Sequence, residues 1–126
     1  MHRLYQLKKV QKLLLATNNP GKFRELKEIL PKKIKYLKPK DFKLREPVEN
    51  GKTFKSNAKI KSLYAAKRTG LVCISDDSGL EVDALSKKPG IYSARWAGPT
   101  KNFDIAIKKV FKLLNKKKKL NSKARF

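Results

Sequence analysis

The chain has 126 residues, of which 40% are apolar and 34% are charged, and its formal net charge is +23 at pH 7. This length and apolar content predict one small folded domain. No segment approaches the ~20 consecutive apolar residues of a membrane-spanning helix, and the first ten residues lack the apolar run of a secretory signal. We therefore expect neither membrane insertion nor secretion.

The positive charge is spread along the chain, from Lys8 to Lys123, with 33 Lys and Arg against 10 Asp and Glu. Such a field attracts polyanions, including nucleic acid. We interpret it mainly as a solvated basic surface. The only cysteine, Cys73, allows no disulfide within the chain and favours a reducing, cytoplasmic setting with an inert, buried thiol.

Strands and helices alternate after a basic N-terminal extension over residues 1–11. The apolar run at 12–16 predicts a strand. The next helix is predicted to begin at Pro20, whose missing N–H would be unpaired there, after a cap at Asn19. Apolar residues at helical spacing continue it until Pro31 ends the helix.

A short strand at 34–37, a polar loop at 38–51 and a helix at 53–69 follow, and Gly70 is expected to close this second helix. The continuous apolar run at 71–74 predicts a fully buried strand.

The rest of the sequence predicts a short strand at 80–83, a loop at 88–99 and a helix at 102–116. The inner side of this last helix is predicted to consist of Phe103, Ala106, Ile107, Val110, Phe111, Leu113 and Leu114. Alternating strands and helices favour an α/β fold, with residues 12–126 as one domain.

The first polar cluster links the first strand to the first helix. It consists of Thr17, Asn18, Asn19, Pro20, Gly21 and Lys22. Backbone N–H groups at a helix N-terminus are unpaired and attract anions, and the cluster adds side-chain donors and a cation. Its spacing is not that of a Walker sequence. The pattern indicates either a phosphate cradle or an ordinary capped turn.

The second polar cluster follows the 71–74 strand and contains the adjacent acids Asp76 and Asp77. Two neighbouring carboxylates at a strand end repel each other, and Mg²⁺ would relieve that repulsion. A carboxylate beside a metal can also orient and deprotonate a water. Glu49 could complete the metal shell, with Glu46 as its competitor. The alternative is an Asp-rich, solvated turn.

In the 88–99 loop, Arg95 beside Trp96 could clamp a phosphate, or could be a surface arginine next to a core tryptophan. The only histidine, His2, lies in the N-terminal extension, which argues against Ser-His and Cys-His hydrolase chemistry.

Four linked motifs carry a family resemblance. They are Thr17 to Lys22, Thr53 to Lys61, Asp76 to Leu85, and Pro89 to Gly98. In this order they closely resemble the RdgB-type non-canonical purine nucleoside triphosphate pyrophosphatases, the inosine triphosphatase family. The chain looks like the N-terminal two-thirds of such a protein.

The resemblance implies hydrolysis of ITP, dITP and XTP to the monophosphate and pyrophosphate, which clears damaged purines from the nucleotide pool. It also implies a Mg²⁺ requirement and a cytoplasmic homodimer. The implied fold is a mixed sheet flanked by helices around a central cleft, here without its C-terminal strands and helix.

The resemblance also implies site residues. Thr17 to Lys22 would hold the triphosphate, and Asp77 would accept a proton and bind the metal together with Glu49. Ser78 would contact the substrate. The two cations Lys61 and Arg95 would contact phosphates.

Two departures from the family stand out: Ser56 replaces the usual Glu, and the expected C-terminal base-recognition segments are absent from these 126 residues. We therefore expect low or no turnover from this chain alone. The alternatives are an inactive relative that binds nucleic acid through its charge, and a Maf-type nucleotide pyrophosphatase.

Overall fold

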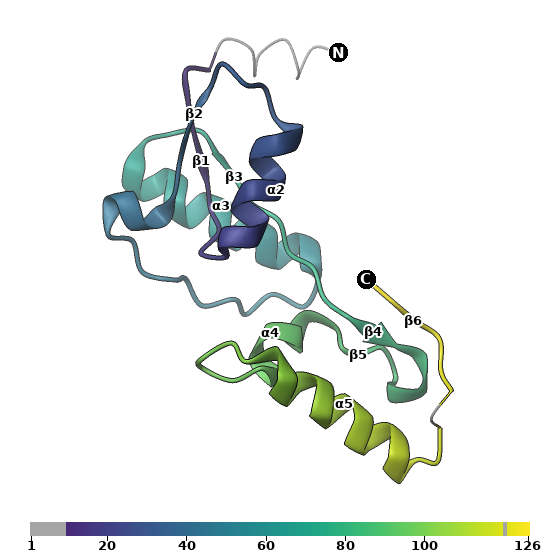
Figure 1. The fold of residues 1–126 in the computed structure, drawn as a ribbon. Coiled ribbons are helices and arrows are strands. Elements are labelled where there is room, and N and C mark those ends of the chain that lie inside the picture. The colour runs from purple at the N-terminus through teal and green to yellow at the C-terminus, as the bar shows by residue number, and fades with distance from the viewer. Residues whose placement is uncertain (1–9, 120) are drawn as a thin grey trace. The chain divides into compact units, whose positions relative to one another are not determined.

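The structure is a computed structural model that describes residues 10–119 and 121–126. These residues form two compact units, of which the first ends at Asp76 and the second begins at Asp77 (Figure 1). Most of the predicted N-terminal extension, including His2, lies outside the described residues. The expectation of a single domain over 12–126 stays a prediction.

The first unit contains a parallel three-stranded sheet with the order β2-β1-β3. The strands are β1 (Lys12–Leu15), β2 (Lys35–Leu37) and β3 (Cys73–Ile74). In the central strand, Leu14 is paired with residues of both neighbours. The carboxyl ends of all three strands therefore lie at one edge of the sheet, where ligands bind in open α/β folds.

One face of this sheet is covered by α2 (Pro20–Ile29). Leu13 and Leu15 of β1 are fully buried in a cluster with Ile34, against which Phe23 of α2 packs.

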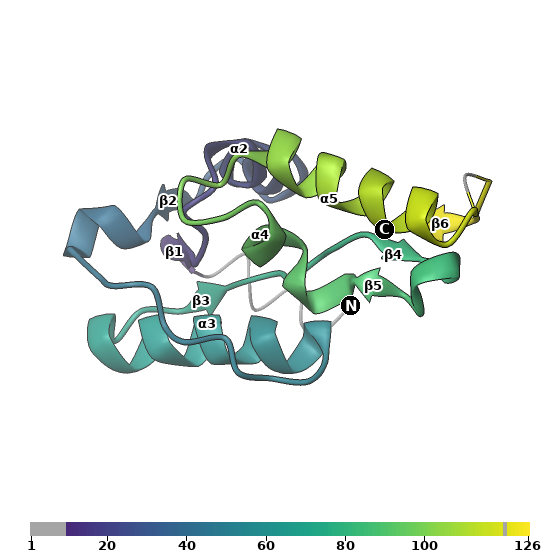
Figure 2. The ribbon, with the colours of Figure 1, turned by 90° about the horizontal axis from the view of Figure 1, so that it is seen from below.

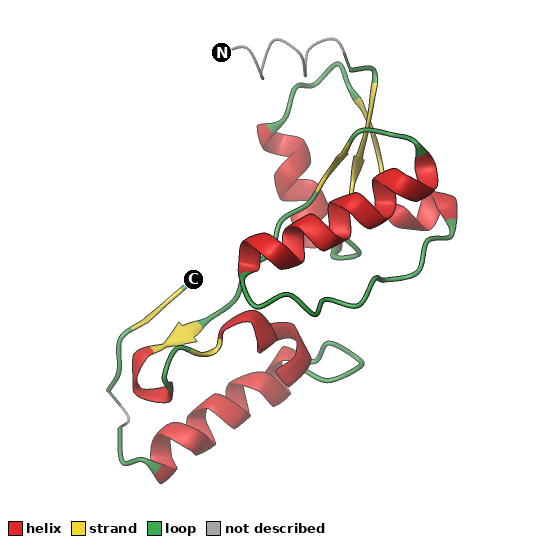
Figure 3. Cartoon of the chain, turned by 180° about the vertical axis from the view of Figure 1, so that it is seen from behind, coloured by secondary structure: helices red, strands yellow, loops and turns green. Residues whose placement is uncertain are grey.

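The opposite face is covered by α3 (Phe54–Thr69), as Figures 1 and 3 show. Leu14, also fully buried, clusters with Ala16 of the same segment and Ala65 of α3. Since both faces of β1 are covered, its sequence is a continuous apolar run rather than an alternating one.

The prediction of a fully buried strand at 71–74 is wrong. Val72 is 51% exposed, and Cys73 and Ile74 are only half-buried. The reason is position: β3 is at the edge of the three-stranded sheet, and β1 holds the buried centre.

The predicted helix ends are confirmed. Asn19 caps α2, and α3 runs from its cap at Thr53 to Gly70. Gly70 has φ +69°, a left-handed conformation that glycine adopts without steric cost. The predicted loop at 38–51 contains a 3₁₀ helix over Pro39–Phe42.

The second unit contains an antiparallel sheet with the order β5-β4-β6, in which β4 (Glu81–Val82) pairs with β5 (Lys88–Pro89) and β6 (Ala124–Arg125) (Figure 2). A 3₁₀ helix, Asp83–Leu85, follows β4. The predicted loop at 88–99 is more ordered than expected. It contains β5, a 3₁₀ helix (Gly90–Tyr92) and the short α4 (Ser93–Trp96).

The last helix, α5 (Phe103–Lys116), corresponds to the predicted helix at 102–116, and Asn102 is its cap. Its predicted inner side is only partly correct. Ala106 is buried, and Val110, Leu113 and Leu114 are half-buried, but Phe103, Ile107 and Phe111 are 50%, 64% and 62% exposed. Within the second unit α5 packs against α4 and the 83–85 turn, both of which are short elements.

The α/β class is confirmed, with the strands of the described residues arranged in two small sheets. No helix within 10–119 and 121–126 is both long and apolar enough to cross a bilayer.

Leu14→Ala should lower the free energy of unfolding by about 3 kcal/mol, because it removes a fully buried side chain from a strand covered on both faces. Urea unfolding followed by circular dichroism measures the change. Ile29→Ala, at a side chain 79% exposed, serves as the control and should stay within about 0.5 kcal/mol of the parent. Equal losses in the two variants would contradict the assignment of β1 as the core strand.

Candidate functional site

The loop at 17–22 is held by its own side chains. The Asn19 Oδ1 atom accepts hydrogen bonds from the Gly21 and Lys22 amides at 2.9 and 3.3 Å, and Thr17 Oγ1 accepts one from the Asn19 amide at 3.1 Å. These backbone N–H groups are therefore not vacant anion donors, as the sequence suggested. The loop offers side-chain groups instead, with the Lys22 ammonium as its cation.

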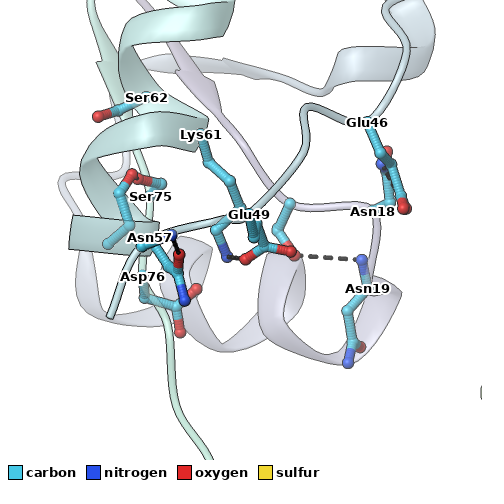
Figure 4. A network of polar contacts seen from close by, with 12 residues as sticks. Asn18, Asn19, Glu46, Glu49, Asn57, Lys61, Ser62, Ser75 and Asp76 are labelled. Carbon is cyan, nitrogen blue, oxygen red and sulfur yellow. Dashed lines mark hydrogen bonds and ion pairs between the residues drawn. The ribbon is translucent and has the colours of Figure 1, made fainter. Parts of the chain in front are cut away.

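Asn18 connects this loop to a distant segment of the chain. Its side-chain amide donates a hydrogen bond of 3.0 Å to Glu46, 28 residues further along. Figure 4 shows the pair beside the loop. Glu46, considered above as a metal ligand, thus orients an amide of the predicted phosphate cradle.

Lys22 brings the loop together with the acid pair. Its Nζ lies 3.3 Å from Asp76 Oδ2. This contact forms because β1 and β3 are parallel neighbours, so the residues that follow them meet at the same edge of the sheet. The loop and the first acid are therefore joined within the first unit.

Two carboxylate oxygens of the acid pair lack partners. Asp76 Oδ1 and Asp77 Oδ2 are buried without a hydrogen bond. A buried carboxylate oxygen without a partner is costly, and a divalent cation is a ligand that can satisfy such an atom. No three His, Cys, Asp or Glu side chains gather into a metal-binding group within the described residues. The donor set fits Mg²⁺, which commonly takes one or two carboxylates and fills its shell with water and phosphate oxygens.

Glu49, the other predicted metal ligand, lies next to Lys61, which the sequence analysis predicts to contact phosphate. The Nζ of Lys61 lies 3.7 Å from Glu49 Oε1 (Figure 4). The loop that carries Glu49 is fixed by Asn57, whose side chain is 1% exposed and accepts the Gly51 amide at 2.8 Å. Sequence reasoning missed this function of Asn57. A polar residue within the first turn of a helix, following a glycine-containing loop, was the available signal.

Ser56, which stands where the family usually has Glu, completes the start of α3. Its amide donates to Thr53 Oγ1 at 3.0 Å, while its hydroxyl accepts from the Thr53 amide at 3.1 Å. This reciprocal capping box is usually completed by Glu or Gln. The serine therefore keeps the helix start and lacks the negative charge.

Asp77, Ser78 and Arg95 belong to the second unit. Ser78 is exposed, and the next residue, Gly79, is buried. A Cβ atom at Gly79 would lie 2.1 Å from the backbone oxygen of Gly90 and 2.6 Å from Ser93 Oγ. The same Ser93 hydroxyl accepts from the backbone amide that follows Gly79. Close backbone packing therefore fixes the segment that carries Asp77.

Arg95 is exposed, and its guanidinium carbon lies 5.0 Å from the centroid of the Tyr92 ring. The neighbouring Trp96 ring instead contacts the ammonium of Lys109, at 4.4 Å from its centroid. Both are cation–π contacts at the surface.

The chain matches the family model described as the Ham1 family over residues 13–126. It is 50% identical to the dITP/XTP pyrophosphatase of Bradyrhizobium diazoefficiens and 48% identical to that of Zymomonas mobilis, in each case over 84% of this chain and 51% of the relative.

Among solved structures, it resembles a HAM1 protein from Coxiella burnetii with a TM-score of 0.75 at 38% identity, covering 85% of this chain and 55% of that one. The Ham1 protein of Staphylococcus aureus matches with a TM-score of 0.69 at 40% identity, over 82% and 54% of the two chains. The chain spans about half the length of these relatives over the residues that match.

Cys73 should react slowly with thiol reagents at neutral pH. Burial raises the pKa of this thiol, and a weaker opposing effect of the Thr69 side chain does not reverse the shift. The thiolate, which is the reactive form, is therefore scarcer at pH 7–8 than in an unfolded chain. Stopped-flow labelling of native and urea-unfolded protein across pH 7–10 measures the difference. A native rate equal to the unfolded rate at pH 7.5 would contradict it.

Gly79→Ala should destabilise the second unit by more than about 2 kcal/mol, because the added methyl overlaps the backbone of Gly90. Hydrogen exchange of amides in β4 and β5 reports on this unit directly. Ala84→Gly, at a half-buried position in the adjacent 3₁₀ turn, serves as a comparison and should produce a smaller loss. Unchanged exchange in Gly79→Ala would show that the segment can shift to accept a side chain.

Proposed function

Because the chain belongs to the Ham1 family, we propose that it carries the triphosphate-binding and metal-binding part of a non-canonical nucleoside triphosphate pyrophosphatase. The proposed reaction converts ITP, dITP or XTP to the monophosphate and pyrophosphate. The names of the Bradyrhizobium and Zymomonas relatives support this substrate class. We further propose that the protein is cytoplasmic and acts as a homodimer.

The observation that carries the proposal is the 3.3 Å contact between Lys22 of the loop and Asp76 of the acid pair. The contact joins the cation that we propose to bind phosphate to a carboxylate whose other oxygen is unpartnered. Hydrolysis between two phosphates needs both kinds of group close together, because the substrate's negative charge must be neutralised where a water attacks.

Each side chain has a distinct function in this proposal. Lys22 and Lys61 hold phosphate oxygens as point charges. Asp77 accepts the proton of the attacking water, for which its partnerless oxygen supplies an open lone pair. Ser78 and Arg95 provide further contacts to the substrate.

Glu49 and Asp77 would hold Mg²⁺, with Asp76 beside them. When bound, Mg²⁺ neutralises phosphate charge. The unpartnered carboxylate oxygens support this choice of cofactor, since hard oxygen donors suit a hard cation.

The two ion pairs of the site do not prevent ligand binding. Lys22–Asp76 and Lys61–Glu49 have side-chain exposures between 17% and 39%, and the N–O distances are 3.3 and 3.7 Å. Pairs near solvent are worth only about 0–1 kcal/mol. A triphosphate and a metal ion can therefore replace them, the phosphates taking the lysines and the metal taking the carboxylates.

Incubation of the purified chain with ITP and Mg²⁺ should release pyrophosphate, more slowly than from the relatives because the chain spans about half their length. Asp77→Asn should lower the rate by about 100-fold or more, because the proton acceptor is lost. Ion chromatography of pyrophosphate and IMP measures the products.

The matched control is Asp83→Asn, which removes an exposed acid from the same unit and should leave the rate within about twofold. Two results would contradict the proposal: release that does not depend on Mg²⁺, and equal rates for Asp77→Asn and the parent.

A further inference from the structure

A pocket of about 240 Å³ lies in the first unit, beside the 17–22 loop. Its walls come from the loop, from the first turn of α2 and from the segment 38–40. Its chemically relevant lining residues are Thr17, Asn18, Phe23, Arg24, Lys38 and Lys40. None of the family motifs includes the three cations of this group.

The pocket lies on a different face of α2 from Asp76. Residues of a helix are separated by about 100°, so Pro20, Phe23 and Arg24 fall within an arc of roughly 100°. Lys22 points outside that arc, and its ammonium contacts Asp76. Neither Lys22 nor a carboxylate is among the described residues that line the pocket.

The cations of the pocket are available to a ligand. Arg24 and Lys40 are exposed, and neither forms an ion pair with a carboxylate of the described residues. The Lys38 ammonium lies 6.0 Å from the Phe23 ring centroid and likewise has no described acidic partner. Three positive charges therefore line one cavity, whose nearest described carboxylate is that of Glu46, hydrogen-bonded to Asn18 of the wall.

The pocket also contains a buried donor. Thr17 is only 9% exposed, and its oxygen accepts the Asn19 amide. Its own O–H has no acceptor among the residues that the structure describes. A buried hydroxyl hydrogen without an acceptor is unfavourable, and an anion oxygen would supply the missing acceptor.

Size and shape decide which anion fits. The volume corresponds to roughly eight water molecules at ~30 Å³ each, below the ~300–1,000 Å³ of sites for drug-sized ligands. The Phe23 ring, the only aromatic of the lining, already has the ammonium groups of Lys27 and Lys38 at 5.7 and 6.0 Å from its centroid. The pocket therefore suits a short phosphate chain and has no vacant ring on which a base could stack.

We propose that this pocket is a polyphosphate subsite separate from the carboxylate side of the loop, and that Arg24, Lys38 and Lys40 bind the phosphate chain without a metal ion. The subsite deepens the proposed function, since a pyrophosphatase releases a chain of this kind. Its existence does not require that the chain be an active enzyme.

Isothermal titration calorimetry with inorganic tripolyphosphate in EDTA tests the subsite without metal or turnover. The double variant Lys38→Gln/Lys40→Gln should weaken binding by at least about tenfold, because each lost charged hydrogen-bond donor alone accounts for about that factor. Lys40→Glu should weaken it further. Both lysines are exposed, so both variants should fold, which circular dichroism checks.

The matched control is Lys55→Gln/Lys59→Gln, which removes two exposed charges from α3, outside the pocket. It should change the affinity by no more than about twofold at 0.15 M salt, where exposed charges are screened beyond ~8 Å. Equal losses in the two double variants would mean that only the net charge binds, and would overturn the subsite.

Two further arms separate this inference from the proposed function. Lys22→Gln, on the carboxylate side of the loop, should leave tripolyphosphate binding in EDTA within about threefold. If Lys22→Gln abolishes binding and the Lys38 and Lys40 double variant does not, the subsite is wrong.

ITP should bind no more tightly than tripolyphosphate, and inosine should not bind. A chain that binds tripolyphosphate in this pattern without hydrolysing ITP would retain the subsite and lose the proposed enzyme function.

Discussion

Burial of β1 on both of its faces is the constraint on which the first unit depends. Leu13 and Leu15 pack towards α2, and Leu14 packs towards α3. This arrangement fixes β1 between two helices. The position at which the chain leaves the sheet after β1 is therefore fixed as well. The 17–22 loop begins there. The position of Lys22 relative to Asp76 then follows from the pairing of β1 with β3 rather than from any contact within the loop.

The site is organised by pairing opposite charges in a strongly basic protein. Lys22 faces Asp76, Lys61 faces Glu49, and the amide of Asn18 faces Glu46. Three of the chain's 10 acids are therefore paired with residues of the candidate site, although the net charge is +23. The pocket with Arg24 and Lys40 differs, because its described lining includes no acid, although Glu46 is hydrogen-bonded to Asn18 of its wall.

Local signals predicted the element boundaries well. The predicted cap at Asn19, for example, depends on short-range hydrogen bonds between neighbouring residues. Burial was harder to predict, because it depends on neighbours that the local sequence does not specify. The run at 71–74 is apolar whether its strand is central or at an edge. Contacts such as that of Asn18 with Glu46 join residues far apart in the chain, so no local pattern indicates them.

Position 56 shows that the capping of a helix and the supply of a negative charge can be separated. Its hydroxyl maintains the reciprocal hydrogen bonds with Thr53 that a glutamate would otherwise make. The charge of that glutamate is lost while the helix start is kept. Removal of one carboxylate makes the local electrostatic potential more positive. At a site where cations and anions compete for the same side chains, the loss of this carboxylate weakens cation binding relative to anion binding.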